Sequence, residues 1–224
     1  MTVDLAIDHL VVVVPDLEAA RAAFGAAGFT ATPIARHSET MGTANSCIML
    51  EGRYIELMGI VADTPANEGW RSLLASGAGL KGVALATSDI AATAALLADL
   101  QIRTEPARHF SRAMPEGDLR FSVIRLPRDL TPGLQCICCQ HHTRDLLWTP
   151  ASMRHANGAT HIIAASAPGV DALASLGFAP SAATIPVSAG EAGITIALGR
   201  RIADRLLLDI EAATGVSIMP RYPS

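Results

Sequence analysis

Apolar runs bounded by Pro, Gly and Asp recur along the chain and predict short strands around a few helices. The first run, Ala6 to Val14, is strongly β-branched and is closed by Pro15. Asp16 then caps a helical segment, which Gly28 ends. With three further strands, these segments make a β-α-β-β-β unit. Its predicted elements are a strand at 6–14, a helix at 17–27, and strands at 29–34, 47–50 and 53–58.

The same order of elements follows a second time, and a shorter version follows a third time. The second unit has a strand at 80–87, a helix at 90–100, and strands at 102–110, 119–126 and 134–140; the third has a strand at 160–166, a helix at 169–176, and strands at 194–198 and 206–210. Asp8-His9-Leu10 in the first unit is paralleled by Thr160-His161-Ile162 in the third. Such internal repetition is a signal about the whole fold. We therefore predict an α+β protein of repeated β-α-β-β-β modules.

A carboxylate lies in the middle of the last strand of the first unit. The period of two in a strand places Tyr54, Glu56 and Met58 on one face. A carboxylate between apolar neighbours on a core strand costs several kcal/mol, in order of magnitude, unless a partner compensates it. The sequence therefore predicts that Glu56 has a partner.

Composition and charge narrow the class of protein. The chain has 224 residues, is 50% hydrophobic and has a net charge of -4, with 17 Lys and Arg against 21 Asp and Glu spread without blocks. This excludes a basic nucleic-acid footprint. No apolar run approaches the roughly 20 residues of a membrane span, and the N-terminus lacks the pattern of a secretory signal. We expect a cytoplasmic protein whose four cysteines are small buried hydrophobes.

Several motifs together are similar to one known superfamily. They are Asp8-His9-Leu10, Arg36-His37 followed by Gly42-Thr43-Ala44-Asn45, Tyr54-Ile55-Glu56-Leu57, Gln140-His141-His142 and His155-Ala156-Asn157-Gly158-Ala159. With the repeated modules, they resemble the vicinal oxygen chelate superfamily, which includes glyoxalase I, extradiol dioxygenases and bleomycin-resistance proteins. The finer resemblance is to its large glyoxalase-like branch. It covers most of the chain.

The resemblance implies two paired modules that curl one mixed sheet into a cup, with a divalent metal at its bottom. We expect residues 1–150 to form this glyoxalase-like domain and residues 151–224 to form a third, shorter module packed on it. His9 matches the ligand on the first strand and Glu56 the ligand on the last strand of the first module. Mixed nitrogen and oxygen ligands suit Zn, Mn, Fe(II) or Ni without choosing among them.

The second module departs from the superfamily pattern. Its first strand, Leu80 to Leu85, has no His or carboxylate where a third ligand is expected. His141 and His142 end its last strand, and neighbouring positions point to opposite faces, so at most one of them enters the cup. We assign His142 as the third metal ligand and His141 to substrate binding.

A different pairing of modules would supply other ligands. If the first and third modules face each other, His161 and either Asp209 or Glu211 join His9 and Glu56. We favour the first and second modules, because sequential modules usually pack together.

Further positions are candidates for the pocket. We assign His37 a catalytic role beside Glu56, which either ligates the metal or shuttles a proton. Asn45 and Tyr54 are expected to bind substrate. The alternatives are a loop role for His37 and a turn role for Asn45. Four arginines are candidates for holding a carboxylate substrate, although strand-surface arginines are usually solvated: Arg36, Arg53, Arg120 and Arg125.

These assignments predict a metal-dependent enzyme of isomerase, lyase or dioxygenase type that acts on a small molecule with vicinal oxygens. The rival interpretation is a metal-free protein that binds or sequesters a small molecule, as bleomycin-resistance proteins do. We expect no nucleic-acid or membrane partner. An odd number of modules leaves one sheet face to cover, so we expect a homodimer.

Overall fold

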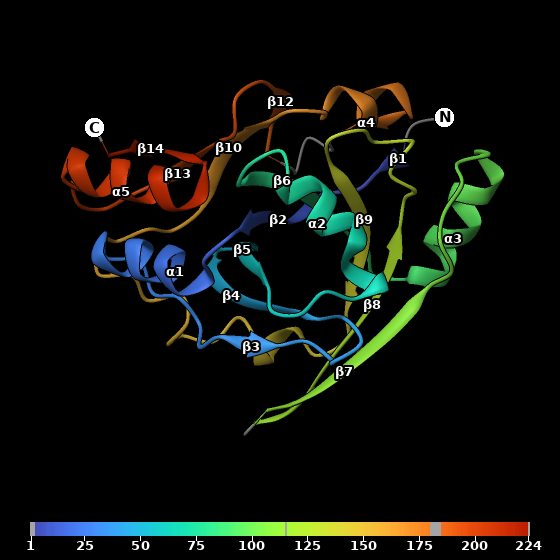
Figure 1. Cartoon of the computed structure of the whole chain (residues 1–224), viewed down its shortest axis with the longest axis horizontal. Coiled ribbons are helices and arrows are strands. Elements are labelled where there is room, and N and C mark those ends of the chain that lie inside the picture. Colours follow the sequence, from blue (N-terminus) through green and yellow to red (C-terminus); the bar gives the residue numbers. More distant parts are fainter. Residues whose placement is uncertain (1–2, 115, 180–184, 224) are drawn as a thin grey trace.

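The computed structural model describes residues 3–114, 116–179 and 185–223. Eight strands form the central sheet, in the order β3-β4-β5-β2-β6-β9-β8-β7, and the sheet is strongly curled, with one concave face (Figure 1). Its strands are β2 (Ile7–Val14), β3 (Ala35–Arg36), β4 (Thr43–Leu50), β5 (Arg53–Ile60), β6 (Gly79–Ala86), β7 (Arg108–Met114), β8 (Gly117–Arg125) and β9 (Gln135–His141).

The central sheet contains two β-α-β-β-β modules side by side. The first is β2, α1, β3, β4 and β5, and the second is β6, α3, β7, β8 and β9. Each module pairs its first strand in parallel with its last, and the antiparallel pair of β2 and β6 joins the two modules. The α+β fold with two paired modules is therefore confirmed, and the modules that share the sheet are the first and the second.

Side-chain caps mark where the two module helices begin. Helix α1 (Leu17–Ala26) starts after Asp16, whose carboxylate accepts a hydrogen bond from the backbone N–H of Ala19 at 2.9 Å. Helix α3 (Ile90–Asp99) starts after Asp89, which accepts from two backbone N–H groups. These are the first unpaired donors of each helix, so the caps fix both starting points. Helix α2 (Glu68–Leu74), after a short 3-10 turn, lies in the connector between the modules.

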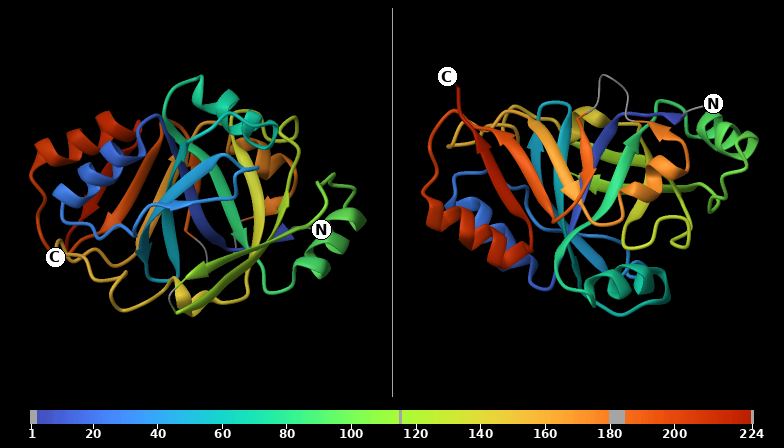
Figure 2. Two further views of the ribbon diagram at one scale, coloured as in Figure 1. Left: turned by 60° about the horizontal axis from the view of Figure 1, so that its bottom comes forward. Right: turned by 90° about the horizontal axis from the view of Figure 1, so that it is seen from above.

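The third segment forms a sheet of its own in the order β12-β10-β13-β14. Helix α5 lies beside α1 in all three views (Figures 1 and 2). A separate parallel pair joins β1 near the N-terminus to β11. The elements are β1 (Val3–Asp4), β10 (Ile162–Ala167), α4 (Asp171–Ser175), β11 (Phe178–Ala179), β12 (Val187–Ala189), β13 (Gly193–Ala197), α5 (Asp204–Thr214) and β14 (Ser217–Arg221).

The strand predicted at 206–210 is wrong, because these residues lie within helix α5. The apolar run fits a strand when it is considered alone. Ile210 and Thr214 are buried at helical spacing, however, and Gly215 ends the helix in the left-handed conformation at φ 66°. Asp209 and Glu211 are consequently exposed on a helix.

Two strands of the modules also differ from their predicted bounds. Residues 29–34 form no strand, and only Ala35–Arg36 pairs with β4. One backbone hydrogen bond, from the N–H of Thr32 to the carbonyl of Cys47, links this segment to β4. Side chains provide further links, since the N–H of Thr30 donates to His155 Nδ1 and the carbonyl of Thr32 accepts from Ser46 Oγ. In the second module, β7 begins only at Arg108 rather than at residue 102.

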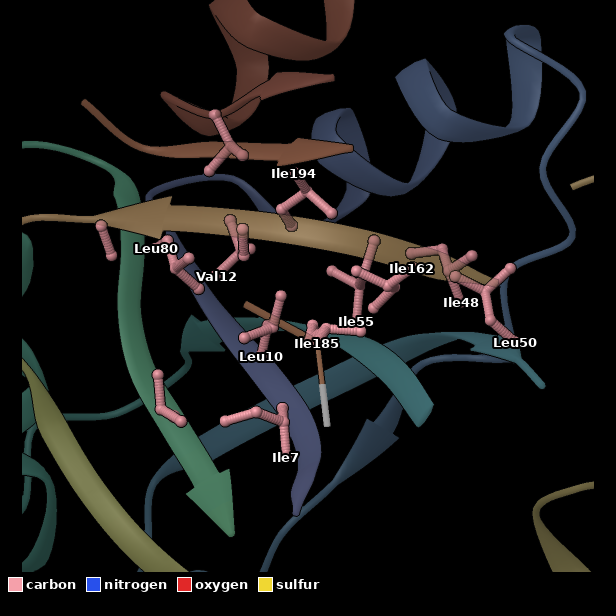
Figure 3. Close-up of a cluster of buried hydrophobic side chains, with 14 of the residues drawn as sticks. Ile7, Leu10, Val12, Ile48, Leu50, Ile55, Leu80, Ile162, Ile185 and Ile194 are labelled. Atoms are coloured by element: carbon pink, nitrogen blue, oxygen red, sulfur yellow. The ribbon is translucent and has the colours of Figure 1, made fainter. Parts of the chain in front are cut away.

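One hydrophobic core joins the third segment to the first two modules. Strand β10 crosses the back of the central sheet, where its side chains meet those of β2, β4 and β5 (Figure 3). Labelled members of this core are Ile7, Leu10, Val12, Ile48, Leu50, Ile55, Leu80, Ile162, Ile185 and Ile194. The opposite, concave face of the sheet is therefore left outside this core. In the described part of the chain, no helix combines the length and the apolar character needed to span a bilayer.

Candidate active site

A cavity of about 370 Å³ lies on the concave face of the central sheet. Its walls are mostly apolar and include Trp70, Phe110 and Phe121, and its polar groups come from both modules. Volumes of about 300–1,000 Å³ are typical of small-molecule sites. The charged and imidazole side chains in the lining are His9, Arg36, His37, Glu56, Arg112, Arg125 and His141.

A β-bulge in β2 positions Asp8 next to His9. Ile7 pairs with Leu85 of β6 and His9 pairs with Ala84, so Asp8 is an extra residue in its strand. A bulge interrupts the strict alternation of faces. As a result, the carboxylate of Asp8 and the imidazole of His9 meet, with Asp8 Oδ2 2.7 Å from His9 Nδ1.

Asp8 is a buried carboxylate bound by three cationic or imidazole side chains. Its Oδ2 accepts hydrogen bonds from His9 Nδ1 and, at 3.0 Å, from His141 Nε2, while Arg144 donates to Oδ1 at 3.3 Å. Burial alone would raise the pKa of Asp8, but the hydrogen bonds from His141 and His9 outweigh it and hold the pKa well below its usual range. Asp8 therefore stays ionised and fixes the orientation of both imidazoles.

His9 and Glu56 face each other across the floor of the cavity. His9 Nε2 lies 3.6 Å from Glu56 Oε2, and the side chain of Glu56 is 12% exposed. Asn45 Nδ2 donates to the other oxygen, Glu56 Oε1, at 2.7 Å. Tyr54 stacks on the imidazole of His9 with 4.3 Å between ring centroids. The structure thus brings together four of the residues that the sequence singled out.

His37 lines the same cavity from the segment before β4. Its Nδ1 lies 2.6 Å from Thr43 Oγ1. Burial lowers the pKa of His37, the charge of Glu56 raises it, and Arg112 and Arg125 lower it, with a net decrease from the ordinary value of 6.5. A neutral imidazole at pH 7 follows, which is a proton acceptor.

The two histidines that end β9 go to opposite sides. His141 enters the cavity, where it packs edge-on against Tyr54 and Trp148. His142 is exposed on the other side, where its Nε2 contacts Ser122 Oγ at 2.7 Å. The structure therefore does not bring His142 to His9 and Glu56. His161 is likewise exposed and outside the cavity.

The sequence reasoning missed Asp8, Arg112 and Arg144 as site residues. Strict alternation sends Asp8 to the face opposite His9, and only its position beside His9 in the opening motif could have drawn attention to it. Arg144 stacks its guanidinium 3.4 Å from the ring centroid of Trp148 while it holds Asp8. The contact between Arg144 and Asp8 joins residues 136 positions apart in sequence, so no local pattern signals it.

The His9 and Glu56 pair fits a shared cation. Because His9 Nδ1 donates its proton to Asp8, a neutral His9 directs the lone pair of Nε2 at the carboxylate of Glu56. Two acceptors facing each other need a cation or a proton between them. Two ligands bound about 2.1 Å from one tetrahedral ion lie roughly 3.4 Å apart, close to the 3.6 Å observed.

A second group of potential metal ligands includes Asp8. Ligand atoms of Asp8, Cys139 and His141 all lie within 4.8 Å of one another. Nδ1 of His141 is buried and has no hydrogen-bond partner among the described residues. Strand β6 adds no ligand, since Ala84 and Gly82 are the residues opposite His9 and Val11.

Comparison with protein families identifies the class of this fold. A family model described as a glyoxalase-like domain matches residues 7–176. The chain belongs to this glyoxalase-like domain family, and the resemblance to the vicinal oxygen chelate superfamily is confirmed. No curated protein matches the chain.

One solved structure shares the fold over nearly the whole chain, and others align with part of it. A Staphylococcus aureus protein described as hypothetical aligns over 97% of this chain and 100% of its own, with a TM-score of 0.72 and 14% identity. A Streptomyces coelicolor methylmalonyl-CoA epimerase in complex with 2-nitronate-propionyl-CoA aligns over 62% of this chain and 99% of its own, with a TM-score of 0.46 and 21% identity. The epimerase from Mycobacterium tuberculosis covers 62% and 91%, with a TM-score of 0.46 and 17% identity. At these identities the likeness concerns the fold alone.

Proposed function

We propose that this protein is a divalent-metal-dependent enzyme that acts on a small molecule with two adjacent oxygen atoms. One observation carries the proposal: Nε2 of His9 faces the carboxylate of Glu56 at 3.6 Å in a cavity of small-molecule size. His9 and Glu56 would hold the ion, which is Zn, Mn, Fe(II) or Ni. When bound, such an ion acts as a Lewis acid on a carbonyl or enediolate oxygen.

The chain's own residues would prepare this reaction in three ways. Asp8 holds His9 in one orientation, and Asn45 holds one oxygen of Glu56. His37 supplies a neutral imidazole in the same cavity. Proton transfer of the isomerase or lyase type needs such a base close to the reacting carbon, so these two types are favoured over dioxygenase chemistry.

The metal content of the purified protein tests this proposal. The protein should be prepared without a metal-binding tag and compared with His9→Ala, Glu56→Gln and His141→Ala. We expect one ion per chain in the wild type and its loss in His9→Ala and Glu56→Gln. His142→Ala and His161→Ala are matched controls, because both histidines are exposed outside the cavity, and they should keep the ion. A wild type that neither carries nor binds added Zn, Mn, Fe(II) or Ni would overturn the proposal.

The second candidate is a metal-free binding protein. The absence of a ligating side chain on the concave face of β6, where Gly82 and Ala84 stand, favours it. The apolar walls of the cavity suit an apolar ligand equally well. Quenching of the fluorescence of Trp70, which lines the cavity, by aromatic compounds in chelator-treated protein that fails to bind metal would support this function.

The predicted homodimer remains a prediction. Light scattering should find twice the chain mass of 23.3 kDa. A species of the chain mass alone, at micromolar concentrations, would contradict it.

A further inference from the structure

The cavity is basic although the protein as a whole is acidic. Its lining contains three arginines, Arg36, Arg112 and Arg125, against one carboxylate, Glu56. The chain's formal net charge is -4. A concave site whose charge is opposite to that of the whole molecule concentrates ligands of one sign, in this case anions.

The three guanidinium groups have no protein partners within the described part of the chain. No ion pair or hydrogen bond of Arg36, Arg112 or Arg125 side chains occurs among residues 3–114, 116–179 and 185–223. Four arginines elsewhere do have such partners: Arg71 with Asp63, Arg103 with Asp129, Arg108 with Glu105, and Arg144 with Asp8. Arginines such as Arg120 and Arg205 also lack a side-chain partner among the described residues, but they are exposed to water, whereas Arg112 and Arg125 are half-buried. The missing partners therefore matter most for the half-buried pair.

Arg125 is the most informative of the three, because it is half-buried and has a lowered pKa. Removal of a guanidinium from water without a partner is costly. The strand alternation of β8 explains its position, since the odd-numbered residues Leu119, Phe121, Val123 and Arg125 all line the cavity. Burial lowers the pKa of Arg125, which the charge of Glu105 partly opposes. An anionic ligand would compensate the charge.

Arg112 lines the cavity at the other end of β8, because it pairs with Leu119, six residues from Arg125. It is on β7, two residues from Phe110, which also lines the cavity and stacks on Phe121 with 5.1 Å between ring centroids. The charges of Arg112, Arg125 and Glu56 all act on His37, so the basic groups are near the proposed catalytic ones. The stacked rings of Phe110 and Phe121 form part of the apolar wall of the cavity, and along the strands they lie between Arg112 and Arg125.

We infer that the cavity binds small organic acids, with the carboxylate of the ligand held by Arg125 and its apolar body against Phe110 and Phe121. A guanidinium is a planar fork of donors that matches a carboxylate. These acids are substrates of the enzyme only on the proposed function, on which this part of the inference rests. The binding itself needs no metal.

Matched acid and amide probes test this inference. Cinnamate and phenylacetate should be compared with cinnamamide and phenylacetamide, which have the same shape without the charge. Binding is measured by tryptophan fluorescence and calorimetry in chelator-treated protein. We expect each acid to bind about 10-fold to 100-fold more tightly than its amide, as loss of charged hydrogen bonds predicts.

Arginine variants locate the binding groups. Arg125→Gln should weaken binding of the acid about 10-fold and leave that of the amide unchanged. Arg120→Gln is the matched control, because Arg120 is exposed on the same strand as Arg125 and is absent from the cavity lining. Circular dichroism and metal content of each variant should equal those of the wild type.

The outcomes separate this inference from the metal proposal. Weaker binding of the acid by Arg125→Gln, with binding of the amide retained, supports the inference. This holds even if the protein proves to be metal-free. Equal binding of acid and amide by the wild type, no binding of either acid, or an equal effect of Arg120→Gln would overturn it. Loss of metal binding in His9→Ala, with acid binding retained, would show that the two groups act independently.

Discussion

Asp8 gives the first prediction at the scale of single residues. It is 1% exposed, accepts from His9 and His141, and is also held by Arg144. Both imidazoles share Oδ2 of Asp8, and Arg144 binds Oδ1. In Asp8→Asn the negative charge is lost and the amide nitrogen cannot accept a hydrogen bond, so the group that orients His9 is weakened. We expect metal affinity to fall about 10-fold to 100-fold, as for other residues that orient metal-ligating histidines. Titration against a competing chelator measures this.

If Asp8 had only a structural role, its replacement would leave the tautomer of His9 unchanged. The imidazole nitrogen chemical shifts of His9 in metal-free protein report its tautomer, and they should change in Asp8→Asn. Asp145→Asn, at an exposed acidic residue next to Arg144, is the control and should leave both readouts unchanged. Unchanged metal affinity and unchanged His9 shifts in Asp8→Asn would show that Asp8 serves only the fold.

At the scale of elements, the turn before β4 depends on Gly42. Gly42 adopts φ 58°, and a Cβ placed on it would lie 2.3 Å from the carbonyl oxygen of Ala62. Its own carbonyl accepts from the N–H groups of Val61 and Ala62. Gly42→Ala should therefore destabilise the fold by more than the roughly 1–2 kcal/mol expected for a left-handed residue alone. It should also displace Thr43 and the His37 that contacts it.

A second glycine separates the steric effect from the conformational one. Gly52 adopts φ 71° in the turn between β4 and β5, and a Cβ placed on it would have no atom of the described residues within 4 Å. Gly52→Ala should cost only the left-handed penalty. Urea unfolding of both variants measures the difference, and equal losses of stability would contradict the close approach of Gly42 to Ala62.

His155 joins three elements and predicts a pH dependence. Its Nδ1 accepts from the N–H of Thr30 at 2.9 Å, so Nε2 carries the proton that is donated to the carbonyl of Met49 at 2.8 Å. Burial lowers the pKa of His155 from 6.5, although the bond to Met49 opposes this. A lowered folded-state pKa means that protons bind more readily to the unfolded chain. Stability should therefore be constant above about pH 6.5 and should fall below it.

The variant His155→Gln checks this pH dependence. Glutamine cannot gain a charge, so the loss of stability between pH 7.5 and pH 5 should be smaller than in the wild type, while stability at pH 7.5 should also be lower. His161→Gln, at an exposed histidine, should keep the wild-type pH profile. An unaltered acid dependence in His155→Gln would assign it to other groups.

The elements also show how far the sequence could predict this structure. Alternation placed Tyr54, Glu56 and Met58 on one face correctly, because β5 is regular over its length and all three line the cavity. It failed at Asp8, since a bulge depends on the pairing of β2 with β6 and leaves no mark in the local pattern. For the two histidines that end β9, alternation showed that only one could enter the cavity but not which one.

The third segment was harder to predict for a different reason. Its first strand repeats the opening pattern of the first module, which favoured strands throughout. The run from Leu206 to Ile210 satisfies both periodicities over so few residues, and the packing of α5 beside α1 decides between them (Figure 2). Tertiary contacts of this kind are absent from any window of sequence.

At the scale of the whole molecule, the shared core predicts that the parts expected at 1–150 and 151–224 unfold together. Ile194 of β13 is fully buried in the same core as Leu10 and Ile55 of the central sheet (Figure 3). Ile194→Ala should therefore cost about 2–5 kcal/mol. Because Trp70 and Trp148 belong to the cavity side, their fluorescence should report the same urea midpoint as circular dichroism.

Leu208→Ala, at a side chain that is 63% exposed, should stay within about 0.5 kcal/mol of the wild type. If Ile194→Ala shifts the dichroism curve and leaves the fluorescence curve in place, the third segment unfolds independently of the site.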